Sequence, residues 1–414
     1  MKAAVPIIAT SLLASMTPVN AAETLTEALT EGKASLNIRV RQESVSQNNP
    51  LDDADALTIR TRLGYKTGDF NGLHGYVEFE DTRDILEVDN YSVPPAGVRT
   101  GEYSVIADPE GSEVNQAFLA YQIDNNLLKW GNQRIIFDNA RFVGNVGWRQ
   151  NEQTYEGYLY QNKFTEGFAA TAAYVTRVNS IFYNGFDHTT YFLNTSYLKN
   201  PAFQPKAYYY AIEDEDRPLA SVDIYGAGAQ GKIDWFNYKA EYAFQRDGNN
   251  NPANYDADYY TAELGATIPN LFNITLSFES LGADDDALRK DQSRSSFQTP
   301  LGTNHAFNGW ADLFLTTPRE GLEDTFVTVG RKVGPVVLKA IYHWFTADEN
   351  FSNGEMSSGD EYGQEIDLLA VWKISNNYTT AFKYANFQAD GDIDGSSLNI
   401  TDTEKFWLWF EAKY

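Results

Sequence analysis

The sequence predicts an all-β protein in which about 18 antiparallel strands close into a barrel that spans a membrane. Three observations support this fold. Segments of about ten residues with alternating apolar and polar side chains recur along the chain, and no segment has the period of a long amphipathic helix. The connections between these segments are alternately short and long. The last segment alternates up to an aromatic final residue, Tyr414, which is typical of the closing strand of a membrane barrel.

The N-terminus has the features of a secretory signal peptide. Lys2 supplies a positive charge, Ala3–Leu13 is mostly apolar, and Val19–Ala21 is a small-residue cleavage motif. We therefore expect residues 1–21 to be a signal peptide and residues 22–414 to form one barrel domain. No later stretch reaches the roughly 20 uninterrupted apolar residues of a spanning helix. The sequence thus predicts an exported protein of the bacterial outer membrane.

The composition agrees with a membrane barrel. Hydrophobic residues make up 43% of the chain, yet its mean hydropathy is −0.44, because apolar residues alternate with polar ones instead of forming long runs. Aromatic residues, at 14%, would supply the rings that line the two membrane interfaces. An aromatic-rich soluble β protein is the alternative interpretation. The chain has no cysteine, which excludes disulfides and thiolate metal sites, and its net charge of −25 argues against a nucleic-acid partner.

Each predicted strand has about the ten residues that a tilted spanning strand needs. In chain order, the predicted strands are residues 35–43, 56–66, 73–83, 113–123, 127–137, 153–162, 166–178, 188–198, 205–213, 220–231, 234–246, 257–268, 271–281, 322–332, 335–347, 361–374, 378–389 and 403–414.

The connections set the number of strands. Short connections such as Thr67–Gly72 alternate with long ones such as Asp138–Glu152 and Gly282–Gly321, as expected for periplasmic turns opposite external loops. Gly309–Leu315 could be a further strand. Placing it inside the loop Gly282–Gly321 restores the alternation and gives an even number, 18, with both termini in the periplasm.

Alternation also assigns a lipid face and a lumen face to each strand. On the first two strands four arginines face the lumen: Arg39, Arg41, Arg60 and Arg62. Other charged residues assigned to the lumen are Lys66, Glu78, Glu80, Lys239, Glu241, Lys339, Glu365, Asp367, Lys373, Lys383 and Lys413, and Trp407 and Trp409 share this face. An Arg or Lys on the lipid face would cost roughly 2–4 kcal/mol at mid-depth.

The arginine cluster has two interpretations. Guanidinium groups bind carboxylates and sulfates through a planar fork, so the cluster could select an anionic substrate. Alternatively, mixed ion pairs could brace the barrel wall, since Glu78 and Glu80 on the neighbouring strand could partly neutralise the arginines.

Three segments together resemble the alginate-export family of Gram-negative outer-membrane porins. They are Ala56–Tyr65 leading to Val77–Asp81, then Gly131–Asn151, and His305–Phe314. The middle segment is the most specific, because an arginine- and glycine-rich loop after a short strand is unusual among general porins. The resemblance covers nearly the whole mature chain. It implies an eighteen-stranded barrel whose luminal arginines and lysines conduct an anionic polysaccharide.

The resemblance adds candidate residues for contacting an anionic substrate: Arg60, Arg62, Arg134, Arg141 and Arg149. Strict alternation would turn Arg134 toward lipid unless a bulge intervenes. Gly144 and Gly147 would let the loop fold back into the pore.

The sequence predicts neither an enzyme nor a metal or cofactor site. The four histidines, at positions 74, 188, 305 and 343, are not tied to a serine by any motif, and a Gly-x-Ser-x-Gly elbow is missing. Asp390–Gly395 resembles the start of an EF-hand loop, but the twelfth position is Thr401 and not a bidentate acid, which favours a solvated acidic loop over a weak Ca²⁺ site. Gly226–Gly231 lacks the helix that a dinucleotide-binding glycine motif requires.

These features predict a monomeric outer-membrane channel that passes anionic sugars or polysaccharide by diffusion through an arginine-lined pore. Its other contacts would be outer-membrane lipid and lipopolysaccharide, with no nucleic acid. One alternative is a general or small-solute uptake porin. The other is a surface binding or adhesion barrel that acts through its long acidic loops.

Overall fold

The computed structural model describes residues 22–163, 167–269, 271–290, 292–352, 358–393, 398 and 400–414. The predicted signal peptide, residues 1–21, lies outside the described residues. The strands form one 18-stranded antiparallel sheet in which each strand pairs with its neighbours in the chain and β1 pairs with β18. The sheet is therefore a closed barrel, as the alternation and the number of connections predict.

The strands are β1 (Lys33–Gln47), β2 (Ala54–Lys66), β3 (Leu73–Asn90), β4 (Gly111–Ile123), β5 (Asn126–Gln133), β6 (Thr154–Lys163), β7 (Phe168–Asn179), β8 (Gly185–Tyr197), β9 (Gln204–Ile212), β10 (Val222–Ile233), β11 (Phe236–Asp247), β12 (Asp256–Ile268), β13 (Phe272–Leu281), β14 (Leu322–Val333), β15 (Val336–Ser352), β16 (Ser358–Lys373), β17 (Tyr378–Ala389) and β18 (Thr403–Lys413).

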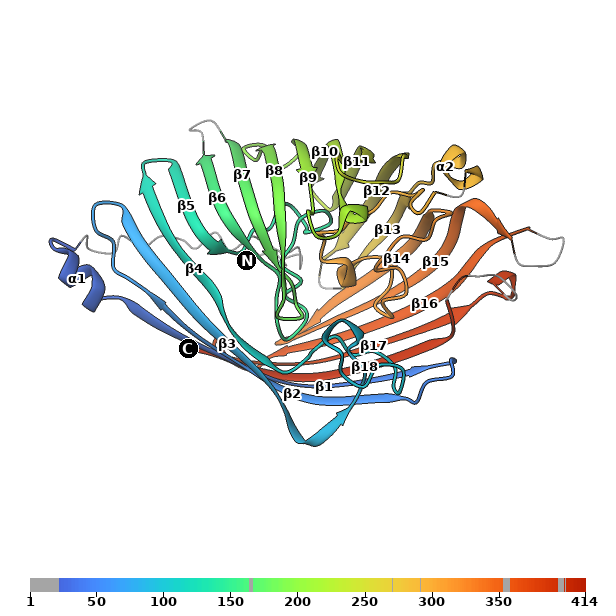
Figure 1. Ribbon diagram of the computed structural model, residues 1–414, viewed down its shortest axis with the longest axis horizontal. Helices are drawn as coiled ribbons and strands as arrows, with labels where there is room; N and C mark the ends of the chain where they lie inside the picture. The colour runs from blue at the N-terminus through green and yellow to red at the C-terminus, as the bar shows by residue number, and fades with distance from the viewer. Residues whose placement is uncertain are drawn as a thin grey trace.

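The helices are short: α1 (Leu25–Thr30), α2 (Asp285–Arg289) and the 3-10 turns η1 (Pro94–Ala96), η2 (Pro218–Ala220), η3 (Asn304–Ala306) and η4 (Gly391–Ile393). Within the described ranges, no helix has the length and hydropathy to cross a membrane. The C-terminus lies near α1 and the first residues of β1, so both ends of the barrel domain are at the end with the short turns (Figure 1).

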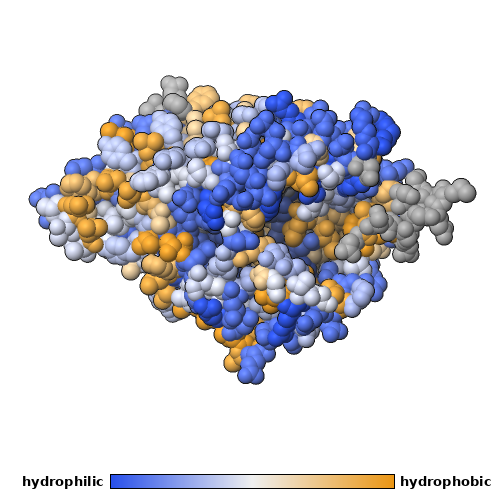
Figure 2. Space-filling view, viewed as in Figure 1, coloured by the Kyte–Doolittle hydropathy of each residue, from blue (hydrophilic) through white to orange (hydrophobic). Residues whose placement is uncertain are grey.

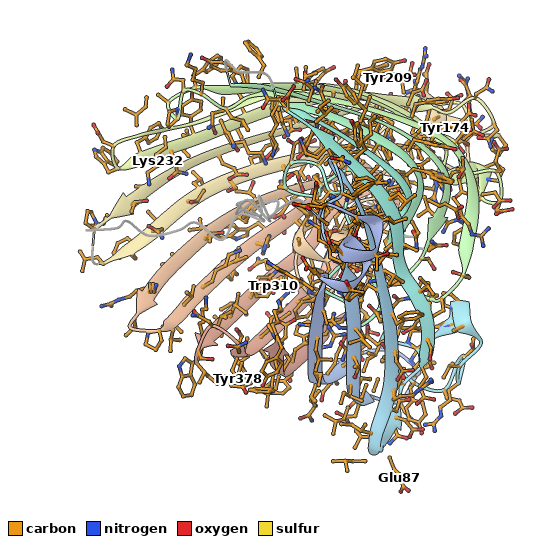
Figure 3. The ribbon with its side chains drawn as sticks, turned by 90° about the vertical axis from the view of Figure 1, so that its left-hand side faces the viewer. Glu87, Tyr174, Tyr209, Lys232, Trp310 and Tyr378 are labelled. Atoms are coloured by element: carbon orange, nitrogen blue, oxygen red, sulfur yellow. The ribbon has the colours of Figure 1, made fainter. Side chains whose placement is uncertain are left out.

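Side chains alternate between the two faces of the wall as expected. On β2 and β3, Leu63 and Phe79 are 55% and 53% exposed on the outer face, whereas Arg60 and Glu80 on the lumen face are each 2% exposed. Figure 3 shows Tyr174 and Tyr209 on the outer surface and Trp310 inside the ring of strands. The outward apolar residues form the surface that lipid covers.

The two ends of the barrel differ in polarity. Hydrophobic residues gather at the left of Figure 2, where α1 exposes Leu25 and Leu29, and hydrophilic residues cover the upper right, where α2 carries Asp285 and Asp286. The acidic residues of α2 belong to a long loop.

Four predicted strand ends differ from the structure by four residues or more. The strand predicted at 35–43 continues to Gln47, and the strand predicted at 335–347 continues to Ser352. The strand predicted at 127–137 ends at Gln133, because Ile135 and Phe137 leave the wall and pack among buried residues inside the barrel. The strand predicted at 73–83 continues to Asn90, where β3 still pairs with β2 beyond a bulge. Leu86 and Glu87 have φ values of 57° and 56° at this extension.

Two long connections fold into the barrel. Residues 134–153 join β5 to β6 and residues 282–321 join β13 to β14. The backbones of the two connections meet where Gly144 N donates to Leu301 O at 2.9 Å and Thr303 N donates to Ala140 O at 2.9 Å. Gly309–Leu315 lies in the second connection and is not a strand, as predicted.

An aromatic cluster fixes both connections to the wall. The Phe142 ring lies 5.5 Å from Tyr208 of β9 and 5.1 Å from Tyr259 of β12, and 5.8 Å from Phe297 of the second connection. Contacts of this kind each add about 0.5–1.5 kcal/mol beyond burial of area. The lumen therefore contains a packed core that only the tertiary fold brings together.

Candidate functional site in the barrel lumen

The four arginines of β1 and β2 converge on one turn of the connection 134–153. Arg39 and Arg60 are direct neighbours on the paired strands. Each guanidinium donates to backbone carbonyls of Gly147–Gln150: Arg39 to Gly147 (3.4 Å) and Arg149, Arg41 to Trp148 (2.6 Å), and Arg60 and Arg62 to Gln150 (both 3.4 Å). These arginines hold the loop against the wall.

Carboxylates compensate most of this charge. Arg41 pairs with Asp108 and lies 3.3 Å from Glu43; Arg62 pairs with Glu80 and lies 3.4 Å from Glu152; Arg60 lies 3.4 Å from Glu411. In the part of the chain that the structure describes, Arg39 has no carboxylate within ion-pair distance, and the side chain of Gln150 accepts from its Nε at 2.8 Å. All four arginines are buried. The bracing interpretation thus accounts for their contacts in this conformation.

Arg134 follows directly after β5 and points into the lumen. Its Nε donates to Glu152 at 2.6 Å and its terminal nitrogen to Glu78 at 2.6 Å. The inward direction needs no bulge, because the ladder and its alternation end at Gln133. The Arg134 side chain is 30% exposed, whereas the side chains of the five other ion-paired arginines are 1–10% exposed and Arg39 is 8% exposed. Burial raises the pKa of the Glu152 carboxyl, but the positive charges of Arg62 and Arg134 outweigh this effect and hold the pKa at about 2.

Arg141 and Arg149 tie the two connections together. Arg141 donates to Glu279 of β13 at 3.1 Å and to Asn308 at 2.8 Å. Arg149 donates to Glu43 of β1 at 3.0 Å and to Asp312 at 3.0 Å. Both arginines therefore link one connection to the other and to the wall.

Tryptophans and a lysine form a second point of attachment, on β17 and β18. The rings of Trp148 and His305 stack with centroids 4.5 Å apart. Lys383 Nζ lies 3.7 Å from the Trp310 ring centroid and 4.2 Å from that of Trp148. Trp407, placed on the lumen face by alternation, is fully buried and packs edge-on against Trp148. Residues from both connections thus surround one lysine of the wall.

The connections fill the half of the lumen near the long loops. Lumen-facing residues in this half are buried on every side of the barrel, as shown by Thr58, Thr82, Gln245, Asp324 and Thr403. In the half near the short turns, lumen-facing residues such as Tyr76, Lys129, Lys239 and Lys339 are only partly buried. The accessible part of the lumen is therefore the vestibule at the short-turn end.

Lysines dominate this vestibule. They occupy the lumen-facing register within a few residues of the short turns: Lys33, Lys66, Lys129, Lys163, Lys206, Lys232, Lys239, Lys332, Lys339, Lys373 and Lys413. Among the described strand residues, the lumen-facing acids within five residues of the short turns are Glu78, Glu241, Glu263 and Glu411. Lys206 pairs with Glu241 at 2.8 Å. Lys239 pairs with Glu263 at 3.1 Å and Lys413 with Glu411 at 3.0 Å, while Lys33 and Lys66 lie directly opposite each other on β1 and β2.

Only part of this lysine ring was predicted. Alternation places Lys66, Lys239, Lys339, Lys373 and Lys413 in the lumen, and the other six lysines were not among the residues predicted to face it. The same rule, carried to the strand ends, would have found Lys33, Lys129, Lys163, Lys206, Lys232 and Lys332.

Three of the histidines, His188, His305 and His343, lie within hydrogen-bond distance of polar side chains. His188 lies 3.0 Å from Thr190 and 3.4 Å from Asp214, and both of these partners are fully buried. Across the described ranges, no group of three or more His, Cys, Asp or Glu side chains could hold a metal ion. Part of the EF-hand-like segment, residues 394–397 and 399, lies outside the described residues.

Comparison with known proteins identifies relatives of the whole barrel. A family model described as "Alginate export" matches residues 34–394. No curated protein matches the chain.

Solved structures share the fold at low sequence identity. Pseudomonas aeruginosa OpdK, solved with vanillate, is 13% identical with a TM-score of 0.68, covering 93% of this chain and 99% of OpdK. Acinetobacter baumannii OccAB2 is 17% identical with a TM-score of 0.69, covering 94% and 99% of the two chains. A. baumannii OccAB4 is 12% identical with a TM-score of 0.67, covering 96% of this chain and 100% of OccAB4.

Proposed function

Because the chain belongs to the alginate-export family of bacterial outer-membrane channels, we propose that it passes anionic sugars or polysaccharide by diffusion. It would act as a monomer, with no catalytic step and no energy source of its own. Outer-membrane lipid and lipopolysaccharide would surround the apolar outer face. Since short turns face the periplasm in such barrels, the vestibule is the periplasmic entrance.

The lysine ring of the vestibule is the observation that carries this proposal. A mouth lined by one sign of charge concentrates counter-ions and steers them inward. Lys33 and Lys66, directly opposite on paired strands, repel each other by roughly 0.2–1 kcal/mol. A bound carboxylate between them would offset this repulsion.

The seven predicted arginines would then act at different stages. Arg134, which is the most accessible, would meet the substrate above the lysine ring. The six others, Arg39, Arg41, Arg60, Arg62, Arg141 and Arg149, are held by carboxylates or loop carbonyls and would meet the substrate only after a loop moves.

Ion selectivity in planar bilayers tests the proposal. The purified channel should give a reversal potential of anion selectivity across a KCl gradient. The double substitution Lys33→Gln and Lys66→Gln should lower the anion-to-cation permeability ratio. Arg331→Gln is the control for charge at the same end but outside the lumen, because Arg331 lies in the outward register of β14; it should be compared with Lys33→Gln alone, which also removes one positive charge. Cation selectivity of the unmodified channel would reject the proposal.

A channel for small carboxylates is the second candidate. The filled long-loop half of the lumen favours it, since a narrow passage suits small solutes better than a polymer, and the similar OpdK barrel was solved with vanillate. Block of the single-channel current by galacturonate oligomers of increasing length distinguishes a polymer channel from a small-carboxylate channel. A polymer channel should be blocked at lower concentration by longer oligomers, whereas a small-solute channel should respond most to the monomer.

A further inference from the structure

One carboxylate of the second connection lies among basic groups from three parts of the molecule. Asp312 Oδ2 accepts from Arg149 of the first connection at 3.0 Å and from Lys405 of β18 at 3.1 Å. Its Oδ1 lies 2.6 Å from Nδ1 of His305. The Asp312 side chain is 4% exposed, so all of its partners are protein groups.

His305 contributes a neutral donor. Burial holds the pKa of His305 at about 3, so the ring is uncharged at neutral pH. Its Nε2 lies 2.6 Å from Lys383 Nζ, and its Nδ1 faces Asp312, an ionised carboxylate that can only accept. The proton of the ring is then on Nδ1, where it is donated to Asp312. Lys405 and Arg149 supply the positive charge.

The basic groups around Asp312 continue the lysine ring upward. Lys339, Lys383 and Lys405 occupy the lumen faces of β15, β17 and β18. Lys383 is opposite Trp407, two residues along β18 from Lys405. Trp310 covers Lys339 and Lys383, and its ring centroid lies 5.5 Å from Lys339 Nζ and 3.7 Å from Lys383 Nζ. An anion that follows this row from the vestibule would arrive at the position that Asp312 occupies.

The backbone around Asp312 is held in a costly conformation. Gly309 adopts its φ of 81° without steric cost, whereas Asn308 and Asp312 have φ values of 52° and 64°, in the left-handed region that is costly for residues with a side chain. Such residues persist only where surrounding contacts impose them. Here the contacts are polar: Glu365 of β16 accepts from the amides of Trp310 (2.5 Å) and Ala311 (2.8 Å). Loss of the Asp312 contacts would therefore favour release of this segment.

We propose that Arg149, Lys405 and His305 form a carboxylate-binding site for the anionic substrate, and that Asp312 occupies it as an internal carboxylate which the substrate displaces. This inference rests on the proposed function. It makes residues 305–313 an autoinhibitory segment at the upper end of the lysine row. A charge-assisted site of this geometry suits the carboxylate of a uronic acid.

Substitution of Asp312 tests the inference. In Asp312→Asn, half-block of the single-channel current by galacturonate should occur at about tenfold lower concentration, because the binding-competent fraction of the site increases. Asp312→Glu should behave like the unmodified protein. Asp285→Asn, which removes the same charge from an exposed position of the same connection, should not change the block.

A cysteine-labelling measurement covers the case in which Asp312→Asn fails to insert. The chain has no cysteine, so Leu313→Cys provides a unique thiol beside Asp312 in a half-buried position. Galacturonate should accelerate its modification by a maleimide, and neutral galactose should not.

The two proposals fail separately. Anion selectivity of the unmodified channel, with equal block in Asp312→Asn and an unchanged labelling rate, would overturn the internal carboxylate and leave the proposed function intact. Cation selectivity of the unmodified channel would reject the proposed function whatever Asp312→Asn does.

Discussion

Glu152 is the residue whose removal should most weaken the first connection. Its carboxylate receives Arg134 Nε at 2.6 Å, Arg62 at 3.4 Å and the side-chain amides of Asn115 and Asn145 at 2.5 and 2.6 Å. Glu152→Gln keeps the shape but leaves two guanidinium groups without this anion. Breaking a buried pair from one side costs roughly 3–5 kcal/mol.

The pKa of Glu152 gives a consistent magnitude. The decrease from 4.5 to about 2 corresponds to about 3 kcal/mol of stabilisation at neutral pH. The opening of residues 140–152 should then become about a hundredfold more frequent in Glu152→Gln. Because the folded pKa lies below the ordinary value, this stabilisation is complete above about pH 4.5 and is lost as the pH falls toward 2.

Amide hydrogen exchange of the protein in detergent measures both effects. Peptides from 140–152 should exchange about a hundredfold faster in Glu152→Gln at pH 7. In the unmodified protein, their protection should fall as the pH drops below about 4.5, and this dependence should be weaker in the variant. Glu156→Gln, an exposed position on β6, is the matched control. A less than threefold change in the exchange rate of residues 140–152 at pH 7 would refute the view that Glu152 holds the first connection in place.

Three further predictions follow from the packing and the charges. Gly144→Ala should separate the two connections and lower the stability of the fold by about 1–3 kcal/mol, because a methyl group there would meet Thr303 and lie 2.8 Å from the Ala140 Cβ. Amide hydrogen exchange of residues 297–303 should become faster in this variant. Gly391→Ala, which places a methyl group in open space, should leave the exchange rate unchanged. Trp310→Ala should raise single-channel conductance by uncovering Lys383 and Lys339, whereas Trp372→Ala on the lipid face should leave it unchanged; equal conductance in both would contradict this role. Anion selectivity should decrease as KCl rises from about 0.1 M to 1 M, since the Debye length falls from about 10 Å to 3 Å, and a salt-independent ratio would argue against steering by the vestibule.

The alternation of side chains explains why the barrel could be predicted so fully. A charged residue on the lipid face is costly, so the register of Arg60 and Arg62 follows from their neighbours Ile59 and Leu63 alone. This constraint acts only inside the membrane. Beyond it, the apolar run Ile135–Phe137 was assigned to a strand although its residues pack inside the lumen, and the polar extension of β3 was missed.

The partners of the luminal charges could not be predicted in the same way. Arg39 and Arg41 were placed in the lumen correctly, but Gln150 and Asp108, which accept from them, lie more than 60 residues away along the chain in irregular segments. The cluster of Asp312, Arg149 and Lys405 joins two such irregular segments to strand β18. No sequence period relates them, because their contacts depend on how two loops fold inside the barrel.

Flux through proteoliposomes tests the central claim most directly. The rates to compare are the entry of trigalacturonate and of maltotriose, an uncharged sugar of the same length, through the purified channel in low salt. The lysine ring predicts faster entry of trigalacturonate and a loss of this preference in the double substitution Lys33→Gln and Lys66→Gln. Equal or slower entry of the anionic sugar would contradict the proposed function.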